Sequence, residues 1–402
     1  MEKIDIDKVI SLLGDMVKIQ SPYFEEADIM DYVLNWLQSN GLDGQIHTFH
    51  EPIETDFYGK NVVGCLDSGK EGPVIYLGGH LDTVKLCKGW KHKPYEAEIE
   101  GDYMYGVGAL DMKAGCAAIM LAIKHFIEET SGQFIGKIVY HFVSDEEGPY
   151  GLGTVFIIKD EIHNIKEEAD FAIITEPSAG FTGVAHPCLC LGARGGYNFE
   201  IKVTGKSAHA ATPELGINAL EDVAKIIGKL KEMEPATDHK LEKSSTCVIG
   251  VTNEVGACSV PDWANIEVFH HAVRGETMET IREKVSAAID EANIEGNATI
   301  EFRKSVAEGF DGGFIPYCID EDNEILLSLK EAVKEECKQD GNIAYFQSIG
   351  DFNHIGGKLE IPTVLFGPNG DNFHSHDERT SLSDTVEVAN SISKFLIKIL
   401  AK

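Results

Sequence analysis

Histidine and acidic residues follow four short apolar segments of the chain, just beyond the point where each segment ends. Along the sequence these residues are His80 and Asp82, then Glu146 and Glu147, then Glu176, and last His374 and His376 behind the turn 367–370. Open α/β sheets bind ligands outside the carboxyl ends of their strands. We therefore expect these side chains to converge on one rim of a sheet and to form a site.

Imidazole and carboxylate donors without thiolate suit zinc, manganese or cobalt, and two such ions can share a bridging carboxylate. Asp111, at the start of an expected helix, is the natural bridge, although an ordinary helix cap explains it equally well. Asp82 projects on the same side of an extended segment as His80 and can hold the imidazole through its other nitrogen. Glu146 and Glu147 point in different directions, so one can bind metal while the other accepts a proton. Read alone, this acidic turn could be merely solvated.

Apolar periodicity predicts the elements that position these residues. Continuous apolar strands alternate with helices in the first and last parts of the chain, which indicates an α/β domain with a mostly parallel sheet and helices on both faces. Its strands are expected near 73–77, 137–143, 171–174 and 362–366, and its helices near 9–17, 29–36, 112–127, 323–337 and from 384 onward. Between them a β-α-β-β-α-β order predicts a ferredoxin-like α+β insert. The expected domains are 1–188, the insert 189–306, and 307–402, so the insert interrupts the first domain.

Composition narrows the functional classes. The 402 residues include 35 basic and 66 acidic side chains, a formal net charge of −31. This excess argues against a nucleic-acid or anionic-membrane binder, because both require a basic surface. No apolar run is long enough to span a bilayer and no secretory leader is visible. Nine cysteines without a Cys-x-x-Cys pair favour free thiols, and we expect a cytoplasmic protein.

These motifs, in this order, resemble the di-zinc metallopeptidase family that includes acetylornithine deacetylase, succinyl-diaminopimelate desuccinylase, aminoacylase and glutamate carboxypeptidase. The resemblance runs from the His80-x-Asp82-Thr-Val motif to His374-Ser-His-Asp-Glu378. It implies that His80 and Glu176 hold one metal, that Glu147 and His374 hold the other, and that Asp111 bridges them. It also implies that Asp82 orients His80, that Glu146 is the general base, and that the peptide after Asp111 is cis. His374 is preferred to His376 because of its offset from Glu378.

The insert resembles the dimerisation or lid domain of that family, through Gly205–Pro213 and the following Gly216-Ile-Asn218. By this resemblance His209 reaches the site of a partner subunit in a homodimer and polarises the scissile carbonyl; the alternative is an exposed turn histidine. Three positions depart from the family pattern. Phe269 and His271 stand where an Asp and a substrate-binding Arg are usual, and Val107 replaces another Arg. The arginines Arg194, Arg274 and Arg379 remain open as substitutes, and the turn 367–370 could also receive a carboxylate.

The resemblance and the donor set together predict metal-assisted hydrolysis of an amide in a small N-acyl amino acid. Two divalent ions are expected, zinc first, with cobalt and manganese as alternatives. A dipeptidase, aminopeptidase or carboxypeptidase of the same family is the second hypothesis. A non-catalytic binder of metal or peptide is the third, and the presence of Glu146 disfavours it.

Overall fold

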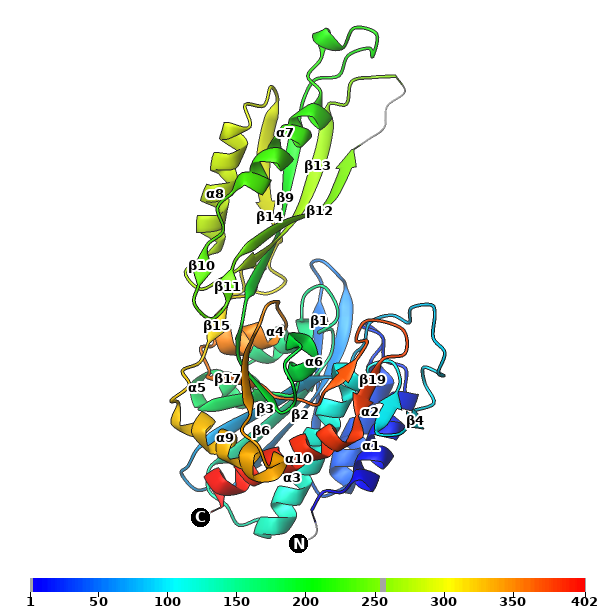
Figure 1. Ribbon diagram of the computed structural model, residues 1–402, viewed down its shortest axis with the longest axis vertical. Coiled ribbons are helices and arrows are strands. Elements are labelled where there is room, and N and C mark those ends of the chain that lie inside the picture. Colours follow the sequence, from blue (N-terminus) through cyan, green and yellow to red (C-terminus); the bar gives the residue numbers. More distant parts are fainter. Residues whose placement is uncertain (1–2, 254–257, 402) are drawn as a thin grey trace. The chain divides into compact units, whose positions relative to one another are not determined.

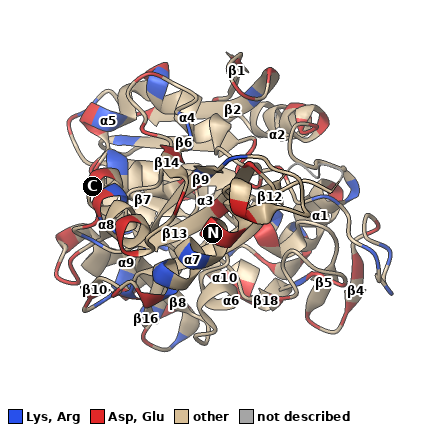
Figure 2. Cartoon of the chain, turned by 90° about the horizontal axis from the view of Figure 1, so that it is seen from above, with Lys and Arg blue, Asp and Glu red and all other residues tan. Residues whose placement is uncertain are grey.

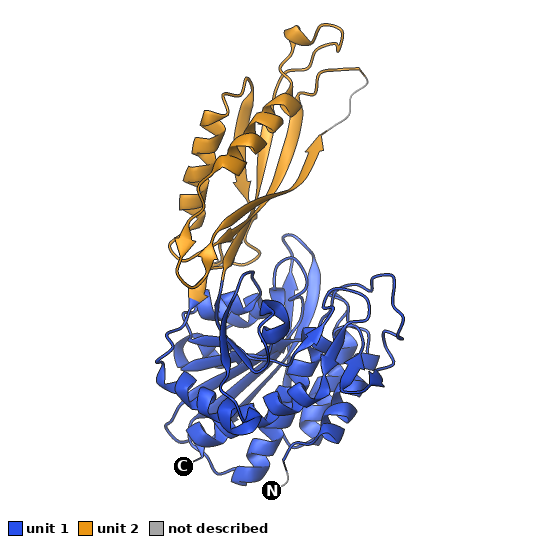
Figure 3. Cartoon of the chain, viewed as in Figure 1, with its two compact units in different colours: residues 1–193, 318–402 blue, residues 194–317 orange. Residues whose placement is uncertain are grey.

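The computed structural model describes residues 3–253 and 258–401, and the chain divides into two compact units. Unit 1 consists of residues 1–193 and 318–402, and unit 2 of residues 194–317 (Figure 3). The sequence suggested an insert of 189–306. Unit 2 starts later than predicted because Cys188–Ala193 forms strand β8, which pairs with strands of the large sheet in unit 1.

A nine-stranded mixed sheet is the centre of unit 1. Its strands run in the order β1-β2-β6-β3-β7-β17-β8-β15, with β16 also paired to β8. The inner strands β6, β3, β7 and β17 are parallel neighbours. Every residue of β3 is buried, so both faces of this strand are covered. The strands are β1 (Gln45–Glu51), β2 (Phe57–Asp67), β3 (Val74–His80), β6 (Lys137–Val143), β7 (Phe171–Ile174), β8, β15 (Tyr317–Cys318), β16 (Asn342–Phe346) and β17 (Thr363–Leu365).

Helices of unit 1 pack on this sheet and on one another, which confirms the α/β prediction (Figure 1). Helix α3 is almost entirely apolar and buried in its first ten residues, and it packs against α10, α1 and β3. Polar caps define several starts, since Asp5, Asn323 and Ser381 each accept a backbone N–H of the first turn. The helices are α1 (Ile6–Lys18), α2 (Ala27–Ser39), α3 (Ala114–Thr130), α4 (Leu152–Lys159), α5 (Ile165–Glu168), α6 (Ser178–Thr182), α9 (Glu324–Cys337) and α10 (Leu382–Leu400).

A second, four-stranded antiparallel sheet in unit 1 carries the segment that ends at Glu378. Its order is β18-β19-β5-β4, formed by Gly370–Asp371, Arg379–Ser381, Tyr103–Tyr105 and Glu98–Glu100. The pairing of β19 with β5 brings residues near 378 beside the segment before Asp111. Two distant parts of the sequence therefore meet at the predicted bridging residue.

Unit 2 has the predicted β-α-β-β-α-β order. Its antiparallel sheet has the strand order β12-β13-β9-β14, which is the ferredoxin-like arrangement, and α7 and α8 cover an apolar core. The elements are β9 (Gly195–Thr204), α7 (Ala219–Glu232), β12 (Ser245–Asn253), β13 (Trp263–Ala272), α8 (Met278–Glu291) and β14 (Asn297–Phe302). A short two-stranded sheet, β10 (Thr237–Asp238) with β11 (Glu242–Lys243), was not predicted.

Acidic and basic positions are spread over many helices and strands (Figure 2). In the part of the chain that the structure describes, no helix combines the length and the apolar character needed to cross a bilayer. All nine cysteines are free thiols.

Candidate metal centre

Parallel strands place the predicted residues at one edge of the large sheet. In the β3–β6 pair His80 lies opposite Val143, and in the β3–β7 pair Gly78 lies opposite Ile174. The strands therefore end at the same level, and the residues that follow them begin at one rim. Strand β17 aligns with β7 through Leu365 and Ile174, and the chain beyond it leads to His374.

Asp111 lies between two imidazoles. Its Oδ1 is 3.2 Å from His80 Nε2, and its Oδ2 is 3.3 Å from His374 Nε2. Glu147 Oε2 is 2.8 Å from the same His374 nitrogen, and Glu176 Oε1 is 3.8 Å from His80 Nε2. Two groups could each hold a metal ion, His80 with Asp111 and Glu176, and Asp111 with Glu147 and His374, because the donor atoms of each group lie within 4.8 Å of one another.

The structure separates the two candidate histidines. His374 reaches Asp111 and Glu147, whereas the ring of the exposed His376 lies 3.4 Å from the hydroxyl of Ser375. Of these two histidines, His374 belongs to a potential metal-binding group, and His376 belongs to none among the described residues.

A buried glutamate fixes the backbone around Asp111. The carboxylate of Glu378 accepts the N–H groups of Gly108, Leu110 and Asp111 at 2.9–3.0 Å. The peptide between Asp111 and Met112 is cis, as the resemblance implies. Gly115 lets the first turn of α3 approach the end of β7, since a Cβ here would lie 2.1 Å from the carbonyl oxygen of Thr175. The motif that ends at Glu378 carries no signal for these contacts.

Asp82 links His80 to the acidic turn after β6. His80 Nδ1 lies 3.0 Å from the Asp82 carbonyl oxygen and 3.6 Å from its Oδ1, so Nδ1 faces Asp82 and leaves Nε2 for the site. The Asp82 carboxylate accepts the backbone N–H of Glu146 at 3.1 Å and that of Glu147 at 2.9 Å. One buried aspartate thus positions three of the predicted residues.

Asp351 adds a carboxylate that sequence analysis did not identify. Its backbone N–H donates to Glu146 Oε1 at 3.1 Å, and its own carboxylate accepts the hydroxyl of Thr154. Asp351, Glu146 and Glu176 form a further cluster of potential ligands. No sequence signal marks Asp351, because it lies in a loop before a short helical turn and its link to Glu146 is made by the backbone.

The electrostatics of this rim fit a divalent cation. Burial raises the pKa of Glu146 to about 8 and that of Glu176 well above its ordinary value, and neighbouring carboxylates add to both shifts. Burial also opposes ionisation of Asp111, but the imidazoles of His374 and His80 lower its pKa to about 2. No described lysine or arginine pairs with these carboxylates, and the buried Glu176 Oε2 has no hydrogen-bond partner among the described residues. The donor set and this unpartnered oxygen fit metal binding.

Unit 2 contains the remaining predicted residues. His209 lies on an exposed turn, where its Nδ1 accepts the N–H of Ala211. His271 lies on β13 beside Phe269, and burial together with the charge of Arg194 lowers its pKa to about 4. His271 is therefore neutral near pH 7 and is no substitute for a cationic anion receptor.

Two of the three arginines left open by the sequence are already bound to carboxylates. Arg274 forms a bidentate ion pair with Asp238, with hydrogen bonds of 2.8 and 3.2 Å. Arg379 donates to Asp371 and to the hydroxyl of Tyr105. The Nε of Arg194 donates to the carbonyl oxygen of Leu241.

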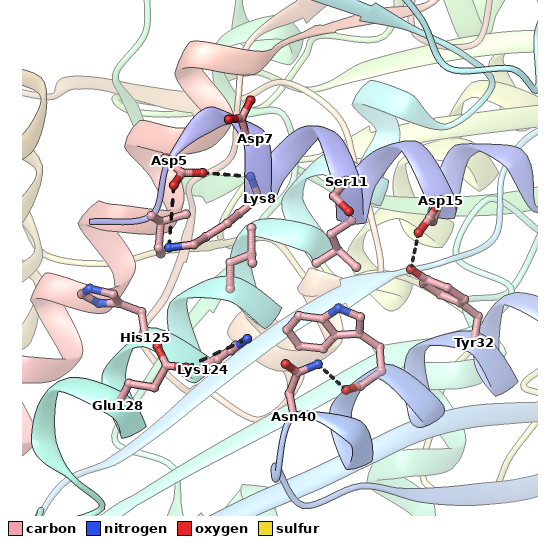
Figure 4. A pocket seen from close by; sticks show the side chains of 14 residues that line it. Asp5, Asp7, Lys8, Ser11, Asp15, Tyr32, Asn40, Lys124, His125 and Glu128 are labelled. Carbon is pink, nitrogen blue, oxygen red and sulfur yellow. Dashed lines mark hydrogen bonds and ion pairs between the residues drawn. The ribbon is translucent and has the colours of Figure 1, made fainter. Parts of the chain in front are cut away.

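A separate pocket of about 780 Å³ lies among α1, α2 and α3 (Figure 4). Its walls combine Trp36 and Leu121 with charged side chains such as Asp15 and Lys124. None of the predicted metal ligands lines it.

The chain is similar to known proteins over nearly its whole length. Residues 76–398 match the model of peptidase family M20/M25/M40. The chain is 26% identical to succinyl-diaminopimelate desuccinylase of Hydrogenovibrio crunogenus, over 98% of this chain and 100% of that protein. The fold is similar to that of a tripeptidase from Staphylococcus aureus, with a TM-score of 0.80, 20% identity and 99% of each chain covered. It is also similar to a dinuclear metal-binding peptidase from Bacillus subtilis, with a TM-score of 0.69, 14% identity, and 98% of this chain and 99% of that one covered. The chain belongs to peptidase family M20/M25/M40 and is a hydrolase.

Proposed function

We propose that this protein hydrolyses the amide bond of a small N-acyl amino acid, with two divalent metal ions held at the rim of the large sheet. The observation that carries the proposal is the Asp111 carboxylate, whose two oxygens face the imidazoles of His80 and His374 separately. His80 and Glu176 would hold one ion, Glu147 and His374 the other, and Asp111 would bridge them. The ions, when bound, supply Lewis acidity and a water that ionises near neutral pH.

Glu146 is the proposed general base. Its side chain reaches the rim but is not a member of either group that shares Asp111. The N–H of Asp351 holds its Oε1, and the contact of its own N–H with Asp82 fixes the turn. Glu146 takes a proton from the attacking water and later gives one to the leaving amine. Zinc is the first candidate for both ions, because imidazole and carboxylate donors suit it.

Replacing Glu146 by Gln tests this assignment. Glu146→Gln keeps the shape of the side chain and removes the base, so turnover should fall by about 10²–10⁴-fold while the metal content stays the same. The matched control is Glu167→Gln, an exposed glutamate of α5 whose loss should leave turnover unchanged. Retained activity in Glu146→Gln would overturn the assignment of the base.

A desuccinylase or deacetylase is the preferred activity, because the succinyl-diaminopimelate desuccinylase named above matches 98% of this chain at 26% identity, whereas the two peptidases match at 20% and 14%. A peptidase that recognises a free α-ammonium group is the second candidate. The specific observation in its favour is Asp351, an additional buried carboxylate at the rim, together with a neutral His271 in place of an Arg. Kinetics on N-succinylated and N-acetylated amino acids beside dipeptides and tripeptides distinguish the two candidates.

We also propose a cytoplasmic homodimer that forms through unit 2, in which His209 of one chain serves the site of the other. Nine free thiols support a reducing compartment. Strand β12 is an edge of its sheet and exposes Ile249 and Val251, at 60% and 44% of their surface, which supports an interface there. Ile249→Lys should produce monomers in sedimentation experiments and reduce turnover if His209 acts across the interface. Full activity of such monomers would contradict this role.

A further inference from the structure

A second set of metal-binding side chains lies in unit 1, outside the rim of the large sheet. His186, Cys337 and Glu387 place an imidazole nitrogen, a thiol sulfur and a carboxylate oxygen within 4.8 Å of one another. None of these residues has a part in the amide hydrolysis proposed above. Their chemistry differs from that of the rim, which contains no sulfur donor in its potential metal-binding groups.

The imidazole of His186 lacks the hydrogen bonds that a buried histidine normally makes. Its side chain is 95% buried, that is, 5% exposed, and neither ring nitrogen has a hydrogen-bond partner among the described residues. The contact of Nε2 with Glu387 Oε2, at 3.3 Å, is an ion pair that lacks the geometry of a hydrogen bond, and it lowers the pKa of Glu387. Buried polar groups without partners are rare in native proteins and call for an explanation.

The separation of these two atoms is that of ligands on one zinc ion. Zinc–nitrogen and zinc–oxygen bonds of about 2.0–2.1 Å at a tetrahedral angle place the two donor atoms roughly 3.3 Å apart. Nδ1 of His186 faces a second carboxylate, Asp384 Oδ2, at 4.0 Å. Carboxylates commonly take this position behind a metal-bound histidine, where they orient the ring.

Local contacts hold the three side chains near one another. Cys337 is the last residue of α9, and Glu387 is on α10, against which α9 packs. The loop that carries His186 is fastened to the chain just after α9, because Gln339 donates to the His186 carbonyl oxygen and Asn342 donates to that of Ala185. Asp384 and Glu387 are three residues apart and so share a face of α10. Figure 1 shows α9 and α10 in unit 1.

We propose that His186, Cys337 and Glu387 form a third metal site, selective for zinc and separate from the catalytic centre. A mixed nitrogen, sulfur and oxygen donor set suits zinc and disfavours magnesium or calcium. On binding, the Cys337 thiol releases its proton to solvent and its sulfur forms the bond to the ion. Glu387 is 36% exposed, so an ion can enter from solvent past this side chain. The bound ion would join the end of α9, the start of α10 and the loop before β8.

Cobalt is the sharpest probe, since a thiolate ligand gives Co²⁺ an intense charge-transfer band in the near ultraviolet that nitrogen and oxygen ligands do not. Metal-free full-length protein titrated with Co²⁺ should take up three ions per chain, and the band should reach the amplitude of a single thiolate-bound ion. Cys337→Ser should abolish the band, and Cys65→Ser, a half-buried cysteine on β2, should leave it intact. Asp111→Asn should also retain it, so that failure of the catalytic centre is distinguished from failure of this site.

Two further measurements keep the test independent of folding defects. Glu387→Gln is a milder change and should weaken Zn²⁺ binding at this site by about 10-fold or more while circular dichroism stays that of the wild type. Zinc analysis should give one ion fewer in Cys337→Ser than in Cys65→Ser, with amide hydrolysis retained in both. A wild-type protein that binds Co²⁺ without the band, or a band that survives in Cys337→Ser, would overturn the proposal and leave a buried imidazole–carboxylate pair only.

Discussion

The buried glutamates at the rim of unit 1 and the buried acidic side chains of unit 2 have pKa values shifted in opposite directions. In unit 2, burial opposes ionisation of Asp238 and Glu276. Their interactions with basic partners outweigh this effect, and each pKa falls to about 2. Arg274 pairs with Asp238, and Lys284 lies 2.9 Å from Glu276. In unit 1, burial and neighbouring carboxylates raise the pKa of Glu146 to about 8.

We interpret this difference as one between acidic groups that stabilise the fold and the proposed metal ligands. Unit 2 supplies cations from its own side chains, so its acidic groups are neutralised when the chain folds. The rim of unit 1 gathers carboxylates around two histidines, and in the proposed function bound metal ions would supply the neutralising charge. Perturbed pKa values are common in both functional sites and structural networks, and the sign of the shift together with the type of partner distinguishes them here.

Metal removal should have the largest effect and should act on unit 1 alone. Chelation should abolish amide hydrolysis, and Zn²⁺, Co²⁺ or Mn²⁺ should restore it. Because the ions bind only the folded state, an ion at 100 times its Kd should add about 2.7 kcal/mol of stability. Activity assays and thermal unfolding with and without metal check this. If the chelated enzyme retained full turnover, the carboxylates of the rim would not depend on a metal ion, and this difference from the acidic groups of unit 2 would not hold.

Glu378→Gln should have the next largest effect. The amide keeps one acceptor oxygen, but its NH₂ group would face a backbone N–H of the segment 108–111, so Asp111, the proposed bridge, would lose its position. Loss of such a supporting group typically weakens metal binding by about 10–100-fold. Isothermal titration with Zn²⁺ should show this, while Glu331→Gln, on the exposed face of α9, should bind as the wild type does. Equal affinities would show that the contacts of Glu378 do not support the site.

Asp238→Asn should have the smallest effect, confined to stability. The lowered pKa of Asp238 stabilises the folded state above the unfolded value near 4, and this contribution is lost as the pH falls through about 2. We expect a loss of about 1–2 kcal/mol at pH 7, since Arg274 is partly exposed to solvent. The difference should shrink toward pH 2 in urea denaturation, with hydrolysis unchanged.

The control for this variant is Asp340→Asn. Asp340 is 79% exposed and pairs with Lys334, so its replacement should change stability by less than about 0.5 kcal/mol at any pH. Equal losses in the two variants would mean that the Asp238–Arg274 pair has no special role in unit 2.

The residues that follow the predicted strands were the best guide to the candidate site. Apolar runs predicted β3, β6, β7 and β17, and parallel pairing then brought His80, Glu147, Glu176 and His374 together with Asp111. The roles of these residues stay predictions. The edge strand β1 was missed because Gln45–Glu51 is polar and half-exposed, with no strict alternation.

Contacts made by the backbone could not be read from the sequence. Asp351 reaches Glu146 through its N–H, and Glu378 holds three N–H groups, so the identity of their neighbours gives no signal. The group of His186, Cys337 and Glu387 was missed for another reason. Its members come from a loop and two helices far apart in the sequence, and no motif spacing connects them.

Asp111 is proposed to join two metal ions, and anomalous diffraction from crystals grown with Zn²⁺ would locate these ions. Data at the zinc absorption edge should show two peaks on either side of the Asp111 carboxylate, one beside His80 and Glu176 and the other beside Glu147 and His374. Asp111→Asn crystals should lose or weaken both. Absence of density at this rim in zinc-saturated, active protein would show that Asp111 bridges no metal ions.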